Sequence, residues 1–292
     1  MYTAFDAGEV FYKVKSSVQE LVPLLVKYGI GGINPPAELL EDPIRAREAA
    51  RCVADAGLKW SLLPTPADFL SFATDDTMFD AGLEKLKIWA DTGAMMGVKY
   101  AYSHIFPGSD ERDYERNFDW HAIRIGRVNR VLKGGGIRYG IEFLGPWDLR
   151  NMFRYPFIHT IAGQRALCAA VDPTIGFVFD TFHWYTGCDA DMDDLRYAAQ
   201  NVRDMICFHI NDGIAGKGAR EQRDLTRAMP MTTGVIDSVT PYRLFRDRGY
   251  QGPVLAEPIN PIYEDFRKMP AEEVVRIIAE CYGRMEALAD GR

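Results

Sequence analysis

Four apolar segments between residues 141 and 260 each carry one side chain that can bind a metal ion or move a proton. These side chains are Glu142 in IEFLGP, Asp180 in GFVFDTFH, His209 in FHIND and Glu257 in LAEPIN. Alone, each would pass for a helix cap or a turn residue. Together they would bury several carboxylates among Ile, Val, Phe and Leu, which is costly unless a cation compensates the charge.

The residue types indicate which cation this would be. Two Glu, one Asp and one His form an oxygen-rich ligand set. Such a set suits Mn²⁺, Mg²⁺ or Co²⁺ better than it suits a zinc ion of the thiolate-bound kind. The sequence therefore predicts one divalent metal ion, with Mn²⁺ as the expected species.

Two further histidines stand near the same segments. His183 follows Asp180 by three residues and is expected to contact a substrate or to add a metal ligand, the alternative being a plain surface histidine. His104 ends the apolar segment AYSH and is expected to face the same pocket. His121 and His159 are expected to be structural or solvent-facing.

These side chains need a scaffold that brings the ends of several segments together, and the alternation of short apolar runs with amphipathic ones supplies it. Eight strand–helix units of this kind predict parallel strands joined by helical crossovers and closed into a (β/α)8 TIM barrel, an α/β fold, over a single domain of residues 1–292. Active sites of such barrels lie at the C-terminal ends of the strands. We predict strands at 3–8, 31–36, 58–66, 98–107, 137–146, 176–185, 205–212 and 252–260, and helices at 16–29, 43–57, 78–97, 113–136, 162–172, 191–202, 240–249 and 271–290.

One connection departs from this regular pattern. Residues 213–234 form an unusually long stretch between the seventh strand and its helix. Long loops in compact domains often serve as functional lids.

Composition excludes several classes of protein. The formal net charge of −7 disfavours a nucleic-acid binder, which normally presents a basic face, and an anionic membrane surface. No stretch reaches the roughly 18 apolar residues of a membrane span, and the first residues lack a signal-peptide pattern. The five cysteines are odd in number and contain no C-x-x-C pair, so we expect reduced thiols and a cytoplasmic location.

Taken in order, IEFLGP, FDTFHWY, FHIND with RAMPMTTGVID, and AEPIN resemble the xylose isomerase-like TIM barrels of the sugar phosphate isomerase/epimerase family. The resemblance runs from about residue 16 to the last helix. It implies that Glu142, Asp180, His209 and Glu257 hold one divalent metal. It also implies that His183 and Arg227 bind substrate. At Met231 the family pattern has a glycine.

The chemistry that the resemblance implies is proton abstraction beside a ketone, through a metal-stabilised enediolate, with Glu142 and Glu257 moving the proton. The expected partner is a small keto-sugar or a 3-oxo-glycoside, and the enzyme is expected to be an isomerase or epimerase, with homo- or hetero-oligomers possible. The first alternative is lyase-type cleavage of 3-oxo-glycosides from the same enediolate. The second is a non-catalytic sugar-binding or assembly subunit. A related DNA-repair endonuclease would need more histidines and a basic face.

Overall fold

The computed structural model describes residues 1–7, 12 and 14–292, and its centre is a parallel β-barrel. Nine strand segments are hydrogen-bonded in the order β3-β2-β1-β12-β10-β9-β7-β5-β4. Their bounds are β1 Tyr2–Asp6, β2 Gly32–Asn34, β3 Lys59–Trp60, β4 Leu62–Leu63, β5 Tyr100–Ile105, β7 Arg138–Phe143, β9 Gly176–Asp180, β10 Met205–Ile210 and β12 Pro253–Ala256.

The third predicted strand, 58–66, is divided into two short segments with Ser61 between them. β3 pairs with β2, while β4 pairs with β5, so the two together occupy one position of the barrel. The Ser61 backbone amide continues the ladder by donating to the Ile33 carbonyl at 2.9 Å. Nine segments therefore make an eight-position, nearly closed barrel, and the predicted fold class is confirmed.

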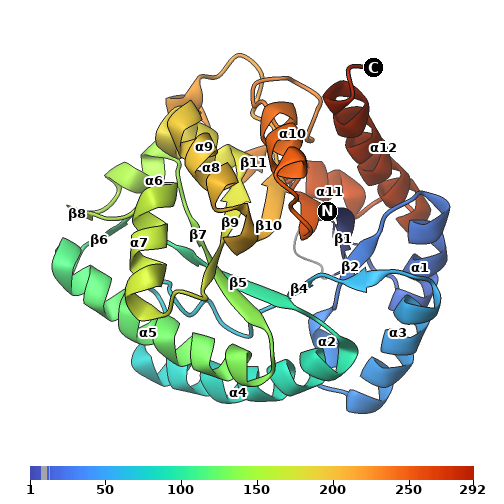
Figure 1. Ribbon diagram of the computed structural model, residues 1–292, viewed down its shortest axis with the longest axis horizontal. Helices are drawn as coiled ribbons and strands as arrows, with labels where there is room; N and C mark the ends of the chain where they lie inside the picture. Colours follow the sequence, from blue (N-terminus) through green and yellow to red (C-terminus); the bar gives the residue numbers. More distant parts are fainter. Residues whose placement is uncertain (8–11, 13) are drawn as a thin grey trace.

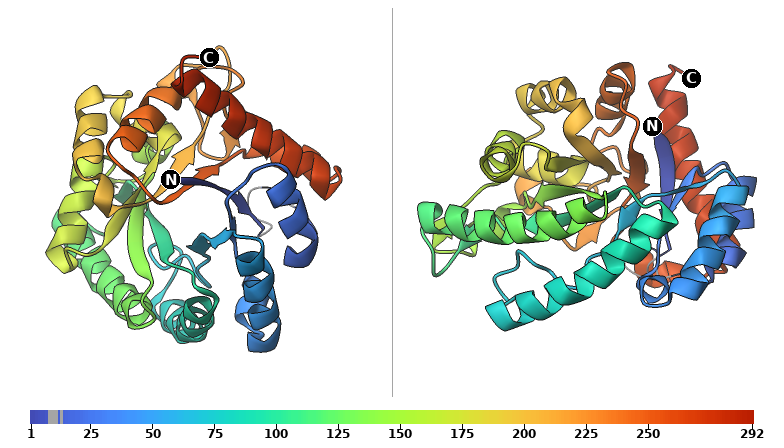
Figure 2. Two further views of the ribbon diagram at one scale, coloured as in Figure 1. Left: turned by 45° about the vertical axis from the view of Figure 1, so that its right-hand side comes forward. Right: turned by 60° about the horizontal axis from the view of Figure 1, so that its bottom comes forward.

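Long helices surround the strands as an outer ring (Figures 1 and 2). They are α1 Val18–Lys27, α3 Pro43–Asp55, α4 Asp76–Met96, α5 Tyr114–Gly134, α7 Ile161–Val171, α9 Met192–Gln200, α10 Val239–Asp247 and α12 Ala271–Ala289. Several start at a side-chain cap that satisfies free backbone N–H groups. For α1, Ser17 and Glu20 form a reciprocal capping box. No helix within the described residues combines the length and hydropathy needed to cross a membrane.

Shorter elements lie in the connections. The short helices are α2 Ala37–Leu40, α6 Trp147–Asn151, α8 Thr181–Cys188 and α11 Ile262–Phe266. There are also two 3₁₀ turns in the described residues, η1 Val202–Asp204 and η2 Ala219–Glu221. Two small sheets pair β6 Gly108–Ser109 with β8 Tyr155–Pro156, and β11 Thr226–Arg227 with β13 Asn260–Pro261.

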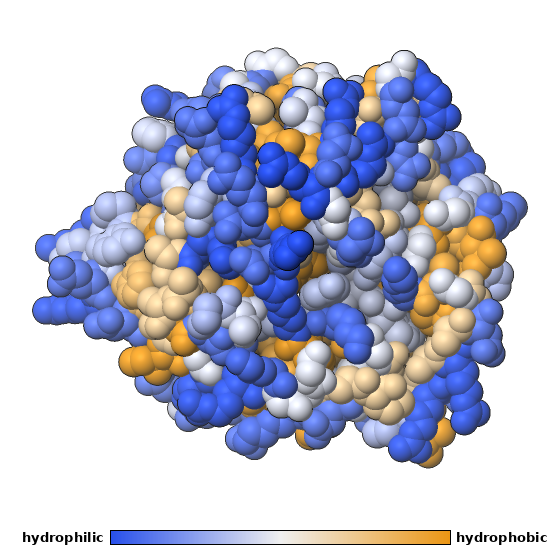
Figure 3. All heavy atoms as spheres, in the orientation of Figure 1, coloured by the Kyte–Doolittle hydropathy of each residue, from blue (hydrophilic) through white to orange (hydrophobic). Residues whose placement is uncertain are grey.

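The barrel lumen is filled by a small apolar cluster, separate from the larger core that the strands share with the helices. It consists of Ala4, Leu62, Val178, Ile206, Cys207 and Leu255. A Cβ at Gly140 or Gly176 would lie 2.5 Å from an Ile206 side-chain atom, so the two glycines make room for it. Outside, the face drawn in Figure 3 is largely hydrophilic, with apolar side chains in separate patches. All five cysteines are free in the described structure.

The prediction of a strand over 176–185 is wrong beyond Asp180. β9 ends at Asp180, and residues 181–188 form α8. The Asp180 carboxylate caps this helix, since Oδ1 accepts the backbone N–H groups of Phe182 at 2.5 Å and His183 at 3.0 Å. The first strand is predicted over residues 3–8, and its last predicted residue, Gly8, lies outside the described residues.

A buried histidine in the outer layer makes stability depend on pH. His121 on α5 is 3% exposed, stacks on Phe157 at 4.8 Å, and has its Nδ1 2.7 Å from the Asn117 carbonyl oxygen. Burial, reinforced by Arg112 and Arg124, lowers its pKa to about 4 despite the Asn117 contact.

We therefore expect the folded state to resist protonation that the unfolded chain accepts near pH 6.5. The free energy of unfolding should fall as pH drops from about 6.5 to 4, by roughly 2–4 kcal/mol from this group. Denaturant unfolding of the wild type and of His121→Gln across this range checks it. The difference in the free energy of unfolding between the two proteins should change with pH in this window. Parallel pH profiles of the two proteins would contradict the assignment.

Candidate active site

The four predicted ligand residues meet at one end of the barrel. Glu142, Asp180 and Glu257 lie at or just beyond the C-terminal ends of β7, β9 and β12, and His209 lies near the end of β10. None is more than 3% exposed. One ligand atom each from Glu142, Asp180 and His209 lies within 4.8 Å of the others. The expectation that active-site residues lie at the C-terminal ends of the strands therefore located residues that the fold brings together.

His209 is the centre of this cluster. Its Nδ1 lies 3.1 Å from Oε1 of Glu142 and 3.1 Å from Oε1 of Glu257, and 3.9 Å from Oδ2 of Asp180. The two glutamates come from strands that β9 and β10 separate in the sheet. The imidazole thus stands between them and contacts both.

The two glutamates differ in their access to the cavity. Glu257 lines it, whereas Glu142 is not among the lining residues. Oε2 of Glu142 instead lies 3.0 Å from Nε2 of His104, whose side chain is 40% exposed toward the cavity. His104 therefore lies between Glu142 and the cavity.

Arg227 supplies the main permanent positive charge of the cluster. Its Nη1 donates to Oδ2 of Asp180 at 3.2 Å, to Oε2 of Glu257 at 2.9 Å and to Oδ1 of Asn211 at 2.8 Å. Nη2 donates to Asp224 at 3.0 Å, and the guanidinium lies 4.3 Å from the centre of the Phe182 ring. Acceptors and an aromatic face thus surround most of this buried cation, which also lines the cavity.

His183 is oriented by the backbone rather than by another side chain. The Gly145 N–H donates to Nδ1 at 3.2 Å, so the proton of a neutral ring is on Nε2, which faces Arg227 and the cavity. A Cβ on Gly145 would lie 2.4 Å from the His183 carbonyl oxygen, so this approach requires a glycine. Burial lowers the pKa of His183, with Arg227 contributing against the nearby carboxylates, which keeps the ring neutral.

The carboxylates respond differently to their surroundings. Burial would raise the pKa of Glu142, but His209 and His104 outweigh it and hold that pKa well below its usual range. Burial together with Asp180 and Glu142 raises the pKa of Glu257 to about 8, against the opposing effect of His209 and Arg227.

The histidines next to the carboxylates shift in the opposite direction. Burial disfavours the charged ring, but the carboxylates prevail, and Glu142 raises the pKa of His104 to about 9. Glu257 and Glu142 likewise hold the pKa of His209 well above its usual range. These shifts describe one strongly coupled cluster of charges.

Residues 213–234, the long connection after β10, are held in place by buried polar side chains. Oδ2 of Asp212 accepts the backbone N–H groups of Thr232, Thr233 and Gly234 at 2.7 to 3.0 Å, and Oδ1 accepts that of Ile236 at 3.1 Å. Arg227 enters the site on β11, which pairs with β13 after the last barrel strand. This segment is thus a fixed support for Arg227.

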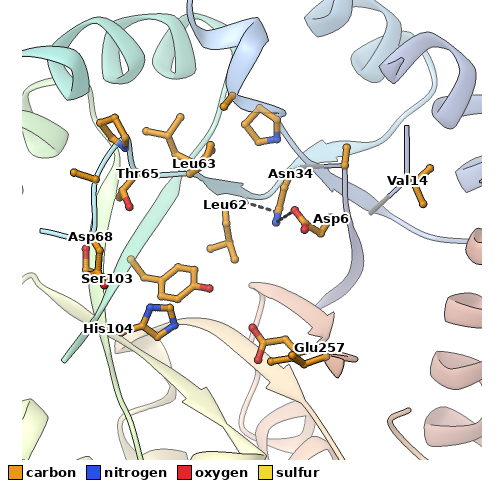
Figure 4. Close-up of a pocket in the computed structure, with 18 of the residues that line it drawn as sticks. Asp6, Val14, Asn34, Leu62, Leu63, Thr65, Asp68, Ser103, His104 and Glu257 are labelled. Atoms are coloured by element: carbon orange, nitrogen blue, oxygen red, sulfur yellow. Dashed lines mark hydrogen bonds between the residues drawn. The ribbon is translucent and has the colours of Figure 1, made fainter. Parts of the chain in front are cut away.

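A cavity of about 1160 Å³ opens beside the cluster. Glu257 and His104 point into the same open space, with Leu62 on its opposite side (Figure 4). The cavity also reaches polar groups that the sequence analysis did not single out. They include Asp6, Asn34, Asp68, Tyr102 and Ser103.

Two of these missed residues, Asp6 and Asn34, carried a usable signal. Asp6 and Asn34 end β1 and β2, so the rule that found Glu142 would have found them in the first half of the chain. They are hydrogen-bonded to each other, since Nδ2 of Asn34 donates to Oδ1 of Asp6 at 3.3 Å. Asn211, which donates to Asp180 at 3.0 Å, follows His209 by two residues.

The chemistry of the donor set fits a divalent cation. Three buried carboxylates and one imidazole converge, and oxygen-rich sites of this kind suit hard or borderline divalent ions. Asp180 and Glu257, the carboxylates that Arg227 contacts, would then bind the ion as well. Glu142, Asp180, His209 and Glu257 are the residues that would hold it.

Known sequences and structures resemble the chain along nearly its whole length. The family described as "Xylose isomerase-like TIM barrel" matches residues 22–281. A xylose isomerase domain protein from Alicyclobacillus acidocaldarius subsp. acidocaldarius superposes with a TM-score of 0.79 at 26% identity, covering 100% of both chains. No curated protein matches the sequence significantly.

More distant structures share the fold. The IolI protein with a bound zinc atom gives a TM-score of 0.78 at 18% identity, with 99% of each chain covered. The 3-keto-D-glucoside 4-epimerase of E. coli gives a TM-score of 0.67 at 16% identity, with 94% of this chain and 99% of that chain covered.

If the cluster holds a metal, neutralising one of its glutamates should weaken binding. We expect Glu142→Gln and Glu257→Gln each to lower the affinity for Mn²⁺ about tenfold or more, because an amide is a poorer ligand than a carboxylate. Calorimetric titration of chelator-treated protein with Mn²⁺, Mg²⁺, Co²⁺ and Zn²⁺ measures this and ranks the ions. Glu38→Gln, which removes another cavity-lining carboxylate, is the matched control and should bind as the wild type does. Equal affinities in all variants would refute the site.

Asp212→Asn should release the 213–234 segment without unfolding the barrel. In asparagine an NH₂ donor replaces one of the carboxylate oxygens that accept backbone N–H groups. This change costs roughly 2–3 kcal/mol of local stability. Limited trypsin digestion read by mass spectrometry should show faster cleavage at Lys217, Arg220 and Arg223. Asp237→Asn, which removes a carboxylate that caps the start of α10, is the control. Unchanged cleavage in Asp212→Asn would show that other contacts hold the segment.

Proposed function

Since the chain belongs to the xylose isomerase-like TIM barrel family, we propose that it is a divalent-metal-dependent isomerase or epimerase of a keto-sugar. The observation that carries the proposal is the cluster of Glu142, Asp180, His209 and Glu257, buried at the strand ends and open to a cavity through Glu257. Perturbed acids and bases gathered at a cavity are the usual mark of an active site.

The reaction requires removal of a proton from a carbon next to a carbonyl, followed by its return. A bound divalent cation supplies Lewis-acid stabilisation of the negative charge that develops on the carbonyl oxygen. Glu257 reaches the cavity directly and is placed to take or return the proton. Glu142, on the other side of His209, is the second carboxylate, and His104 stands between it and the cavity.

Two further side chains are suited to hold the substrate. The Nε2–H of neutral His183 can donate to a sugar oxygen, and its ring is kept in this tautomer by Gly145. Arg227 can donate to substrate oxygens from Nη2 while Nη1 remains with Asp180 and Glu257. Both groups are buried and preorganised, so little reorganisation is needed when the substrate binds.

The fate of the enediolate decides the product. Return of the proton to the opposite face of the same carbon gives an epimer, whereas return to the neighbouring carbon gives an isomer. Loss of a β-substituent gives elimination, which is the lyase alternative. The proposal is supported by two structures of the same fold, one named as a 3-keto-D-glucoside 4-epimerase and the other containing zinc.

The test is solvent deuterium exchange followed by NMR in D₂O with the Mg²⁺-loaded protein. The substrates are free ketoses, inososes and 3-oxo-glucosides. We expect deuterium to enter the carbon beside the ketone, with the product identifying epimerisation, isomerisation or elimination. Glu257→Gln should slow exchange by about 10²-fold or more, since positioned acid–base groups contribute roughly 10²–10⁴-fold. Glu142→Gln should also slow exchange, because it weakens the metal site.

Glu38→Gln again serves as the control, and it should exchange at the wild-type rate. Absence of exchange with the whole panel, in protein that holds a metal, would overturn the keto-sugar assignment. A wild-type protein that binds these sugars without exchange would instead be a sugar-binding subunit.

A further inference from the structure

Among the carboxylates of the cluster, Asp180 has its hydrogen-bonding capacity fully used. Its Oδ1 accepts the backbone N–H groups of Phe182 and His183 at the start of α8. Its Oδ2 accepts Nδ2 of Asn211 at 3.0 Å and Nη1 of Arg227 at 3.2 Å. A carboxylate offers about four lone-pair sites, so these N–H donors occupy the whole group in the described structure. An ion that binds Asp180 must therefore displace one of them.

Of the two Asp180 oxygens, Oδ2 is the one that an ion would need. It lies 3.9 Å from Nδ1 of His209, and one ligand atom each of Glu142, Asp180 and His209 lies within 4.8 Å of the others. Oδ1 is committed to the first turn of α8, which would lose its cap if Oδ1 turned away. The ion would therefore have to replace one of the two donors on Oδ2.

Asn211 is the less movable of these two donors. It is fully buried, and its backbone N–H donates to Oγ1 of Thr181 at 2.9 Å. The Ser238 hydroxyl donates to the Asn211 carbonyl oxygen at 3.1 Å, so both backbone groups are held. Turning the side-chain amide away would leave buried polar atoms without partners, which is costly.

Arg227, the other donor, has further acceptors that it can keep. Nη2 donates to Oδ1 of Asp224 and Nε donates to the Asp224 carbonyl oxygen, both at 3.0 Å. Nη1 also donates to Oε2 of Glu257 at 2.9 Å. Arg227 can therefore give up Asp180 and remain paired with two other carboxylates.

We propose that Arg227 is an internal counter-cation that occupies Asp180 in the metal-free protein and yields this carboxylate to the metal ion. The inference rests on the metal site of the proposed function, and it adds a residue that sets the affinity of that site. The fixed positive charge neutralises the buried carboxylates before an ion arrives, and it also repels the ion. Once an ion is bound, Nη1 keeps Glu257 but no longer Asp180, and Nη2 stays beside His183.

The experiment is calorimetric titration of chelator-treated protein with Mn²⁺, comparing the wild type with Arg227→Met. The methionine is a flexible apolar side chain that lacks both the donors and the charge. We expect Arg227→Met to bind Mn²⁺ at least about tenfold more tightly, because a repelling charge a few ångströms away is removed from a buried site. Arg45→Met is the matched control, since Arg45 also lines the cavity but is exposed, and it should bind as the wild type does.

The outcomes separate this inference from the proposed function. Equal or weaker binding by folded Arg227→Met, with a wild type that binds Mn²⁺, would overturn the counter-cation role and leave the metal site intact. A wild type that binds no divalent ion would refute the metal site itself, and both proposals with it. If Arg227→Met folds only when Mn²⁺ is added, as followed by circular dichroism, the inference is supported, since the ion then supplies the missing charge.

A second measurement follows Arg227 in the wild type and needs no variant to fold. Side-chain N–H signals of ¹⁵N-labelled arginine, assigned by through-bond correlation to the Arg227 backbone, are recorded while diamagnetic Mg²⁺ is added. We expect the Nη1 signals to shift and their hydrogens to exchange severalfold faster with water, because the hydrogen bond to Asp180 is lost. The signals of Arg124, which donates to the carbonyl oxygens of Phe69 and Thr74, should stay unchanged. Unchanged Arg227 signals at metal saturation would overturn the inference.

Discussion

The structure depends on one electrostatic constraint, the burial of three carboxylates at the end of a closed apolar barrel. Glu142, Asp180 and Glu257 are all nearly inaccessible to solvent, and uncompensated charges there would be strongly destabilising. His209 and Arg227 provide the compensation by contacting several of the oxygens at once. Breaking such a network by removing one partner leaves an unpaired buried charge, so each member of the cluster depends on the others.

This constraint explains why the 213–234 connection is long and yet well ordered. The Arg227 guanidinium must reach the centre of the barrel end from a segment outside the strands. Asp212, buried immediately after β10, accepts several N–H groups from the far end of the segment and so fixes its path. The side chain of Gln222 bonds the backbone of Ile214 and Lys217 within the same segment. Buried polar side chains thus fix the course of this segment.

The cavity offers a polar reacting centre at one part of its lining. Near Glu257, His183 and Arg227 it presents charges and oriented hydrogen-bond donors. Elsewhere its lining mixes apolar side chains such as Phe106 with charged ones such as Glu38 and Arg45. Because the charged groups of the cluster are already paired within the protein, binding there requires little rearrangement.

The barrel and the residues near its strand ends could be predicted from the amino-acid sequence. Hydrophobic periodicity reports burial within each segment, so it revealed eight units and the polar residues Glu142, Asp180, His209 and Glu257 near their ends. It did not reveal that β9 stops at Asp180, because Phe182 and Trp184 are buried in α8 as they would be in a strand. That His104 contacts Glu142 and that Arg227 reaches Asp180 became visible only in the folded chain. Such contacts join side chains from different units, and their distances follow from the register of the closed barrel, which no local pattern encodes.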